Sequence, residues 1–219
     1  MKENAYYGGE EFFNVGKKYL RDKGLFYSLK RLFFYLWDKV VGNFLFLKEK
    51  KIFLFDNNKL HYSFHKYNKS WKNERIVEIP IAMFYLKNYY SKEVLEVGNV
   101  LGHYFSFEHD VLDKYEIAEG IMNYDVIDFV PLKKYDLILS ISTFEHVGVD
   151  DDIQNPENAY LGLKNIFKSL NEGGKMLISF PGNYNLALMD MVKNKKLKNF
   201  KVFCFKKNQK KKYLVSGSI

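Results

Sequence analysis

From about residue 90 onward, short apolar runs that suit β-strands alternate with segments of helical periodicity. The predicted strands are Val94 to Val97, His109 to Leu112, a short run within Tyr124 to Phe129, Tyr135 to Ile141, and Lys175 to Phe180. Pro156 to Leu170 is predicted to be an amphipathic helix that the glycines of Asn171-Glu-Gly-Gly174 end. Strands that alternate with helices indicate an α/β domain with a mostly parallel sheet.

The residues before about 90 form a different kind of segment, which is basic and rich in aromatic side chains. Lys51 to Phe55 and Leu60 to Phe64 flank an Asp-Asn-Asn turn, which predicts a β-hairpin. Asn73 to Tyr89 is predicted to be helical, with Pro80 as a kink or as the true start. We expect residues 1–90 to form a helical and hairpin lid, and residues 91–219 to form the α/β domain. Phe200 to Phe205 and Lys211 to Val215 are expected to add a terminal antiparallel pair.

Leucine, phenylalanine and valine recur at helical spacing between Leu25 and Val41, which predicts an amphipathic helix. Its apolar face can pack against the α/β domain. Alternatively it contacts a membrane surface or a partner, because Phe34, Tyr35 and Trp37 lie beside basic residues. Charged residues interrupt the apolar run, so the sequence does not predict a transmembrane span.

The composition limits the partners and the cellular compartment that we expect for this protein. The formal net charge of +8 is compatible with a polyanionic partner such as nucleic acid, but a general compositional bias toward lysine is the favoured explanation. The single cysteine, Cys204, excludes an internal disulfide and a zinc cluster built on cysteines. The first residues lack the apolar core of a signal peptide. We therefore expect a cytoplasmic protein, with peripheral membrane contact as an additional option.

The first strand of the α/β part ends in an acidic residue and a glycine turn. Glu96 closes the strand, and Gly98 and Gly102 follow it. Glycines let the backbone approach a nucleoside cofactor closely. Val100 stands where the dinucleotide fingerprint G-x-G-x-x-G has its second glycine, and this disfavours a phosphate-binding interpretation.

Further polar residues follow the later strands. Asp113 ends the second strand, where a carboxylate can accept hydrogen bonds from ribose hydroxyls. Asp125 lies where it can meet an adenine amino group, and Ser140 to His146 end the fourth strand. The carboxyl ends of parallel strands lie at one edge of the sheet, so these residues are expected to converge on one crevice. Each acid alone is as readily a cap or turn residue.

Three segments carry a resemblance to a known family. They are Val94-Leu-Glu-Val-Gly-Asn-Val-Leu-Gly102, Tyr135-Asp-Leu-Ile-Leu-Ser-Ile-Ser-Thr-Phe-Glu-His-Val147 and Leu170-Asn-Glu-Gly-Gly-Lys-Met-Leu-Ile-Ser-Phe-Pro181. They resemble motifs of class I methyltransferases that use S-adenosylmethionine (SAM), over about residues 90 to 205. Asn68-Lys-Ser-Trp71 and Asn73 to Pro80 are also similar to a bacterial and archaeal subgroup of methyltransferase-like proteins. The resemblance implies a Rossmann-like fold.

The resemblance implies SAM as cofactor and assigns its contacts by position. Glu96, Gly98 and Gly102 would line the methionine part, with Asn99 as a compensating polar contact. Asp113 would hold the ribose. Asp125 and Val126 would contact the adenine. Ser140 and Ser142 would lie under the cofactor. Val100 departs from the family pattern and puts affinity in question.

Methyl transfer needs a general base only when the acceptor must lose a proton. His146 is the best candidate because histidine ordinarily titrates near neutral pH, and Glu145 is the second. A structural histidine that caps the strand end is the alternative. No metal is predicted, because Ser142 stands where related enzymes carry a further acid. The acceptor is expected to meet Trp71, Arg75, Glu78 and Tyr184, although Arg75 and Glu78 can equally pair with each other.

These observations predict a SAM-dependent methyltransferase that acts on a small molecule or a glycan. A catalytically impaired binding or scaffold protein of the same fold is the first alternative, because of Val100. An RNA methyltransferase that uses the basic run Lys206 to Lys212 is less favoured. The sequence does not define the acceptor atom or the oligomeric state.

Overall fold

The computed structural model describes residues 52–89, 91–194, 200–207 and 213–218, together with Leu29, Phe33, Trp37 and Val40. Its centre is a five-stranded parallel sheet with the strand order β5-β4-β3-β6-β7. The strands are β3 (Val94–Val97), β4 (Asp110–Leu112), β5 (Ile121–Met122), β6 (Tyr135–Ile141) and β7 (Leu170–Ser179). The chain is an α/β protein with Rossmann-like topology, as predicted.

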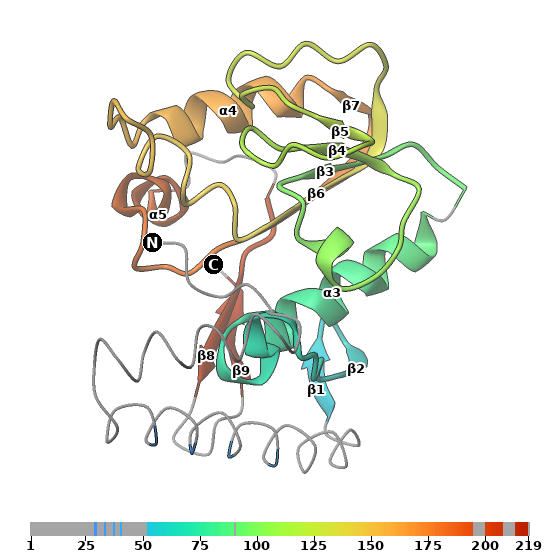
Figure 1. Ribbon diagram of the computed structural model, residues 1–219, viewed down its shortest axis with the longest axis vertical. Helices are drawn as coiled ribbons and strands as arrows, with labels where there is room; N and C mark the ends of the chain where they lie inside the picture. The colour runs from blue at the N-terminus through green and yellow to red at the C-terminus, as the bar shows by residue number, and fades with distance from the viewer. Residues whose placement is uncertain are drawn as a thin grey trace.

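Apolar side chains bury both faces of this sheet, as a parallel sheet requires. Leu95 and Ile138 point to the face covered by α4 (Asn158–Phe167) and α5 (Leu186–Lys193). Val94 and Leu137, their neighbours in sequence, point to the opposite face, because successive strand residues alternate sides. Figure 1 shows α4 on one side of the sheet and α3 on the other.

The second face is covered by α3 (Arg75–Asn88), with Ile79 and Ala82 in contact with the sheet. Pro80 lies inside α3, so the helix begins before it, at Arg75. Ile76, Val77 and Ile81 are buried on the other side of α3, against the hairpin of β1 (Ile52–Phe55) and β2 (Asn58–His61). The short helices η1 (Tyr67–Lys72) and η2 (Leu101–His103) complete this half of the molecule.

The predicted hairpins are both present. Asp56 and Asn57 have positive φ values of 46° and 65°, which suit the two-residue turn between β1 and β2. β8 (Phe203–Lys207) and β9 (Tyr213–Ser218) form an antiparallel pair that is a separate sheet. Aromatic contacts join the two hairpins: the ring centroids of Phe55 and Phe203 lie 4.8 Å apart.

Two predicted boundaries are wrong. The short strand expected within residues 124–129 lies earlier, at β5, because the turn at Gly120 (φ 80°) delivers Ile121 directly into pairing with Val111. Residues 124–129 instead contain a turn that Asp125 stabilises by accepting a hydrogen bond from the Ile127 amide. The glycines of 171–174 do not end α4, which stops at Phe167. They lie in β7, where the pairing jumps from Tyr135–Leu170 to Leu137–Lys175.

The helix predicted at Leu25 to Val41 lies mostly outside the described residues. Leu29, Phe33, Trp37 and Val40 are described, and all four are helical and exposed. Whether the apolar face of this helix packs on the α/β domain therefore concerns residues outside those described. No described helix combines the length and the apolar composition that a membrane span requires.

Candidate functional site

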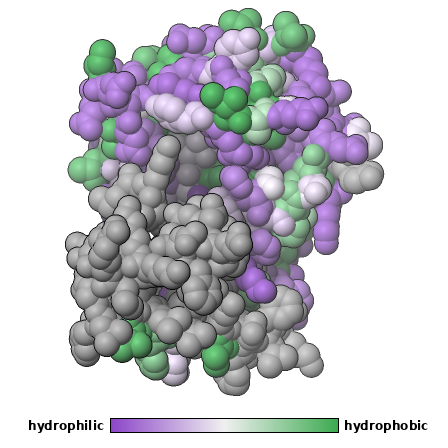
Figure 2. All heavy atoms as spheres, viewed as in Figure 1, coloured by the Kyte–Doolittle hydropathy of each residue, from purple (hydrophilic) through white to green (hydrophobic). Residues whose placement is uncertain are grey.

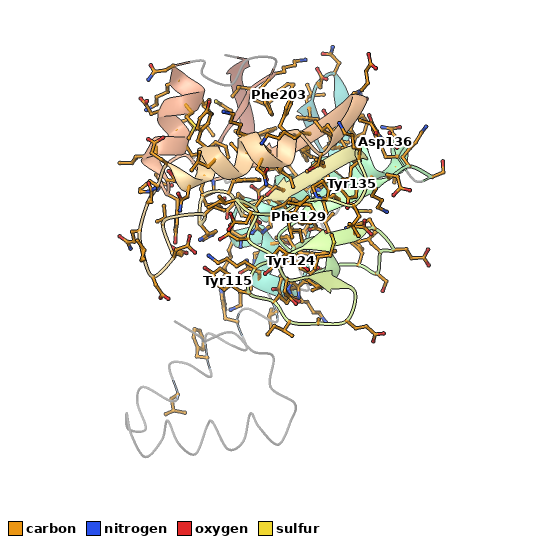
Figure 3. All side chains as sticks on the ribbon, turned by 90° about the horizontal axis from the view of Figure 1, so that it is seen from above. Tyr115, Tyr124, Phe129, Tyr135, Asp136 and Phe203 are labelled. Atoms are coloured by element: carbon orange, nitrogen blue, oxygen red, sulfur yellow. The ribbon has the colours of Figure 1, made fainter. Side chains whose placement is uncertain are left out.

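The candidate site lies next to β3, where the order in which the chain adds strands to the sheet changes direction. β3 is paired with β4 on one side and with β6 on the other, and the carboxyl ends of all three meet at one edge. Ligands of open α/β sheets bind in the crevice at such a switch point. Figure 3 shows Tyr115, which follows β4, at the opposite end of the sheet from Tyr135 and Asp136, where β6 starts.

Gly98 follows β3 at the centre of this edge, with a φ of 85°. A Cβ built on Gly98 would lie 2.1 Å from Oγ1 of Thr143, a residue that follows β6. The site therefore requires glycine for two reasons, the left-handed backbone and the close approach of Thr143. Gly102 is close-packed in the same way, because a Cβ there would lie 2.3 Å from Oδ1 of Asn99.

Glu96 is fully buried, and both of its carboxylate oxygens are used within the protein. Oε1 accepts hydrogen bonds from the amides of Val100 and Leu101, which begin η2. Oε2 lies 2.8 Å from Nε2 of His109, whose side chain is 7% exposed. The carboxylate thus satisfies amides of a helix N-terminus that would otherwise lack partners.

Asp113 directly follows β4 and organises the loop after it. Its Oδ1 accepts hydrogen bonds from the amides of Tyr115 and Glu116, both at 2.8 Å. Its Oδ2 accepts one, from the amide of Asn99 at 3.2 Å. A carboxylate oxygen has room for two donors, so Oδ2 retains one acceptor position. The side chain of Asn99 turns away to donate to Oε1 of Glu116.

An ionic bridge joins the loop after β4 to the loop after β6. Nζ of Lys114 lies 2.6 Å from Oδ1 of Asp151 and 2.8 Å from Oδ2 of Asp125. The hydroxyl of Tyr115 donates to Oδ1 of Asp151 as well. Hydrogen bonds from Lys114 and Tyr115 hold the pKa of Asp151 below its ordinary value. Asp125 is therefore engaged by a lysine within this bridge.

Two of the predicted cofactor residues are buried inside the protein. Ser140 lies within β6, and its hydroxyl donates to the carbonyl oxygen of Val97 on the neighbouring strand. Val126 belongs to the core beneath α4, and its carbonyl accepts a hydrogen bond from Asn165. Both side chains therefore lie in the interior of the protein.

Ser142 follows β6 with a φ of 41° and joins the sheet edge to α3. Its hydroxyl donates to the carboxylate of Glu78, at 2.9 Å from Oε1. Oε2 of Glu78 lies 2.5 Å from Nη1 of Arg75. Arg75 and Glu78 thus pair with each other, the alternative that their i,i+3 spacing allows. Burial raises the pKa of Glu78, and Arg75 opposes that shift.

Glu145 is a buried carboxyl group at the same edge, only 1% exposed. Its Oε2 has no hydrogen-bond partner among the described residues. Burial is the main reason that the pKa of Glu145 rises to about 8, and the nearby carboxylate of Glu78 adds to the rise. At neutral pH this carboxyl group is mostly protonated, so it can donate a hydrogen bond.

His146 is half exposed and is held between two side chains. Its Nδ1 lies 2.7 Å from Oδ2 of Asp150, and its ring packs on Tyr184 with 4.6 Å between the centroids. The hydroxyl of Tyr184 donates to the same carboxylate. Nε2 lies 3.7 Å from Oε1 of Glu145. The arrangement orients the imidazole with Nε2 toward the buried acid.

Trp71 lies on the far side of α3, where its ring packs in the hairpin core. Its Nε1 has no hydrogen-bond partner in the described part of the chain, nor does the hydroxyl of buried Tyr104.

A pocket of about 450 Å³ opens beside η2, lined by the 107–111 and 118–121 segments. Only Asn99 and Gly102 of the predicted residues reach this pocket.

The sequence analysis missed five residues that shape the site. They are Lys114, Tyr115, Thr143, Asp150 and Asp151. The i,i+4 spacing of His146 and Asp150 is the one sequence signal that indicates their pairing. Within the described residues no cluster of three or more His, Cys, Asp or Glu side chains is arranged to hold a metal ion.

The fold and the switch-point crevice define a Rossmann-like α/β domain. No family model matches the chain, and no curated protein matches it. Among solved structures it is similar to the sugar N-methyltransferase KedS8 from Streptoalloteichus, with 12% identity and a TM-score of 0.37. That match covers 65% of this chain and 60% of KedS8, so this chain spans less than two thirds of KedS8.

The chain is also similar to the protein DhpI in a complex with SAM and HEP, again with 12% identity. The TM-score is 0.30, and the match covers 67% of this chain and 75% of DhpI. Both likenesses are distant and concern the fold alone.

Proposed function

We propose that the chain is a SAM-dependent methyltransferase whose acceptor is a small molecule or a glycan with a proton to lose. The observation that carries this proposal is that Asp113, Gly98 and the His146–Asp150 pair follow three adjacent parallel strands, with Gly98 after the central one. A nucleoside-binding acid and an oriented general base would thus share one switch-point crevice.

The nucleoside half of SAM fits the residues that are present. Asp113 keeps one acceptor position on Oδ2 for a ribose hydroxyl, while its other contacts hold the loop in place. Lys114, the residue after Asp113, forms an ion pair with Asp125 and so brings the two aspartates close together. Asp125 is the residue assigned to the adenine. Asp113 and Asp125 would therefore hold the nucleoside, and Gly98 would let it approach the end of β3.

When bound, SAM supplies an electrophilic methyl group, and the protein has to orient and deprotonate the acceptor. Nε2 of His146 would take the acceptor proton, because Nδ1 is engaged by Asp150. The Asp150 carboxylate would stabilise the imidazolium that forms. Tyr184 would keep this carboxylate in place through its own hydrogen bond.

The acceptor would be bound beside two buried polar groups, the Tyr104 hydroxyl at the end of η2 and the Glu145 carboxyl after β6. Tyr104 and Glu145 both lie within the electrostatic influence of the Arg75–Glu78 pair. The Tyr104 hydroxyl and the Glu145 carboxyl both lack partners among the described residues. Buried polar groups ordinarily have hydrogen-bond partners, so an acceptor with hydroxyl or amine groups would satisfy them.

A methyltransferase-like binding protein is the second candidate. Glu96 is fully buried with both of its oxygens engaged inside the protein, and Thr143 packs against Gly98, where a methionine chain would approach. Val100 adds a side chain in the same turn. These features favour weak contact with the methionine half of SAM.

Titration calorimetry with SAM and with S-adenosylhomocysteine tests the proposal. The wild-type chain is expected to bind both, and Asp113→Asn is expected to weaken both by about tenfold or more, a loss of roughly 1.4 kcal/mol. Asp128→Asn, an exposed aspartate on a neighbouring turn, is the matched control and should bind as the wild type does. Asp113 also holds its own loop in place, so Asp113→Asn can disturb the loop structure. Asp125→Asn is therefore measured as a second test of nucleoside binding.

A measurement of methyl transfer distinguishes the methyltransferase from the binding protein. Release of S-adenosylhomocysteine is measured with a panel of amino and hydroxy sugars and phenols. His146→Gln should bind SAM normally and lose methyl transfer. Cofactor binding without turnover on any acceptor would support the binding protein, and absence of binding to either nucleoside would overturn both.

A further inference from the structure

The pocket of about 450 Å³ beside η2 follows from the way in which β3 and β4 are connected. Parallel strands are ordinarily joined through an α-helix that covers the sheet. Residues 98–109, which join these two strands, form only the three-residue helix η2. The connection therefore leaves a hollow over β4 and β5, and its volume lies within the range of sites for small molecules.

The floor of this pocket is apolar and belongs to the sheet. Val111 of β4 and Ile121 of β5 line the pocket, are half-buried and are paired with each other. Leu112 and Met122, the next residues of the two strands, point to the α4 side, so Val111 and Ile121 point to the opposite side. Figure 2 shows mainly hydrophilic residues over the upper part of the molecule, where Figure 1 places the sheet. The pocket thus offers apolar contact within a largely hydrophilic surface.

His109 lines the pocket with one ring nitrogen unused. Its side chain is 7% exposed, and its Nε2 lies 2.8 Å from Oε2 of Glu96. The carboxylate accepts this hydrogen bond, so Nε2 carries the proton of the neutral ring and Nδ1 presents a lone pair. Nδ1 has no hydrogen-bond partner among the described residues. Because Nε2 faces Glu96 on one edge of the ring, Nδ1 on the other edge faces the pocket.

The rim of the pocket is acidic. Residues 107–121 contain five acidic residues against one lysine, a net charge of −4 in a chain whose formal net charge is +8. Three of these acids are engaged by Lys133, by backbone amides or by Asn99. The other two, Glu108 and Glu119, are exposed and line the pocket. Neither forms a hydrogen bond or an ion pair with any part of the chain that the structure describes.

We propose that this pocket binds a small organic cation, an ammonium or guanidinium group on an apolar body. Nδ1 of His109 accepts a hydrogen bond from the cationic group. Glu108 and Glu119 supply the opposite charge at the rim, and the floor of the pocket contacts the apolar body.

The lining disfavours other classes of ligand. An anion would meet carboxylates and a hydrogen-bond acceptor. A metal ion is disfavoured because no cluster of three or more suitable ligands occurs within the described ranges. Asp113 and Asp125, the proposed nucleoside contacts, do not line the pocket. The proposal therefore does not depend on the proposed enzymatic activity.

Calorimetric titration of the full chain with agmatine tests the proposal. Agmatine carries a guanidinium and an ammonium group at the two ends of a methylene chain, and uncharged 1,6-hexanediol and anionic adipate are the control probes. We expect agmatine to bind about tenfold more tightly than either control, and to lose about tenfold in affinity when salt screens the carboxylates. Equal binding of the three probes, or no binding of agmatine, would overturn the proposal.

Paired variants connect the binding to the rim. Glu108→Gln with Glu119→Gln is expected to weaken agmatine binding by about tenfold, because the two carboxylates lose their charge. The matched control is Glu157→Gln with Glu172→Gln, which removes the same charge from two exposed positions outside the pocket and should bind as the wild type does. Equal loss in both pairs would assign the binding to net charge alone and overturn the site.

The imidazole of His109 gives a measurement that needs no variant. In nitrogen-15 NMR spectra of the wild-type chain, agmatine should shift the Nδ1 resonance of His109 and leave the Nε2 resonance nearly unchanged, because Nε2 already donates to Glu96. An unchanged Nδ1 resonance at saturating agmatine would overturn the role of His109.

Titration in the presence of saturating SAM separates this pocket from the candidate crevice. The affinity for agmatine should stay the same, and displacement by SAM would place the cation in the crevice and overturn the proposal. A chain that binds agmatine but not SAM would support this proposal and contradict only the proposed function.

Discussion

Nδ1 of His146 lies 2.7 Å from Oδ2 of Asp150, on the loop that follows β6. In the proposed reaction this carboxylate stabilises the imidazolium formed when Nε2 takes a proton. Asp150→Asn is therefore expected to lower the rate of methyl transfer by about 10² to 10⁴-fold without changing the dissociation constant of SAM. The check is S-adenosylhomocysteine release at saturating cofactor, with calorimetry on the same preparation.

Tyr184→Phe is the control for that variant. It removes the other hydrogen bond to Asp150 and leaves the contact with His146 in place. A smaller loss of rate is expected, of about tenfold or less. If Tyr184→Phe and Asp150→Asn lose the same activity, the carboxylate acts by holding the loop and has no role in proton transfer.

Burial raises the pKa of Glu145 from 4.5 to about 8, and this has a consequence for stability. The unfolded chain releases the proton above pH 4.5, while the folded chain retains it up to about pH 8. Stability from this group is thus present below pH 4.5 and is lost as pH rises through this window, by up to roughly 5 kcal/mol. Glu145→Gln should flatten the decline, as measured by urea unfolding at several pH values.

Glu172→Gln is the matched control for Glu145→Gln, since Glu172 is exposed on β7. It should retain the pH dependence of the wild type. A Glu145→Gln variant whose unfolding free energy declines with pH as steeply as the wild type would show that another group is responsible.

Substitution of Gly98 and of Gly120 by alanine separates two costs of an added side chain, backbone strain and steric contact. Both have positive φ, but an added Cβ meets Thr143 at Gly98 and has open space at Gly120. Gly120→Ala should cost about 1 kcal/mol of stability from backbone strain alone. Gly98→Ala should cost about 3 kcal/mol or more, because the Thr143 contact adds to the strain.

A double variant tests the cause at Gly98. Thr143→Ala removes Oγ1 and Cγ2, two of the three atoms nearest to the added Cβ. It should recover part of the stability lost in Gly98→Ala, by denaturant unfolding. No recovery would place the strain in the backbone and not in the contact.

The bridge from Lys114 and Tyr115 to Asp151 is predicted to order the loop after β4. Asp151→Asn should speed hydrogen–deuterium exchange of the Tyr115 and Glu116 amides. Its effect on global stability should stay below about 1 kcal/mol, because the pair is partly exposed and screened by salt. Asp152→Asn, the exposed neighbour, should leave the exchange unchanged.

Local patterns predicted most of the fold. The limits of β6 were predicted as observed, Tyr135 to Ile141, because a long apolar run bounded by polar residues has few alternatives. The two-residue strand β5 was placed too late, since Ile121–Met122 is too short to show a period. The glycines at 173–174 fit a helix end by composition, but only the pairing of Leu170 with Tyr135 reveals that they belong to β7.

The candidate site was predicted in part. Asp113 and His146 follow the strands where the sequence places them, so their convergence could be anticipated from the parallel topology. The burial of Glu145 could not, because it depends on how α3 packs across the end of β6. The same holds for the contact between Thr143 and Gly98, which joins residues 45 positions apart in the sequence.

The contact between Phe55 and Phe203 has a consequence for how the chain matures. The two residues are 148 positions apart, so most of the α/β domain separates them during synthesis. Until β8 leaves the ribosome, the Phe53 and Phe55 side chains of β1 lack their aromatic partners and present apolar surface. The hairpin layer is therefore expected to be the last part of the protein to acquire its native packing, and to be vulnerable to aggregation in chains truncated before residue 203.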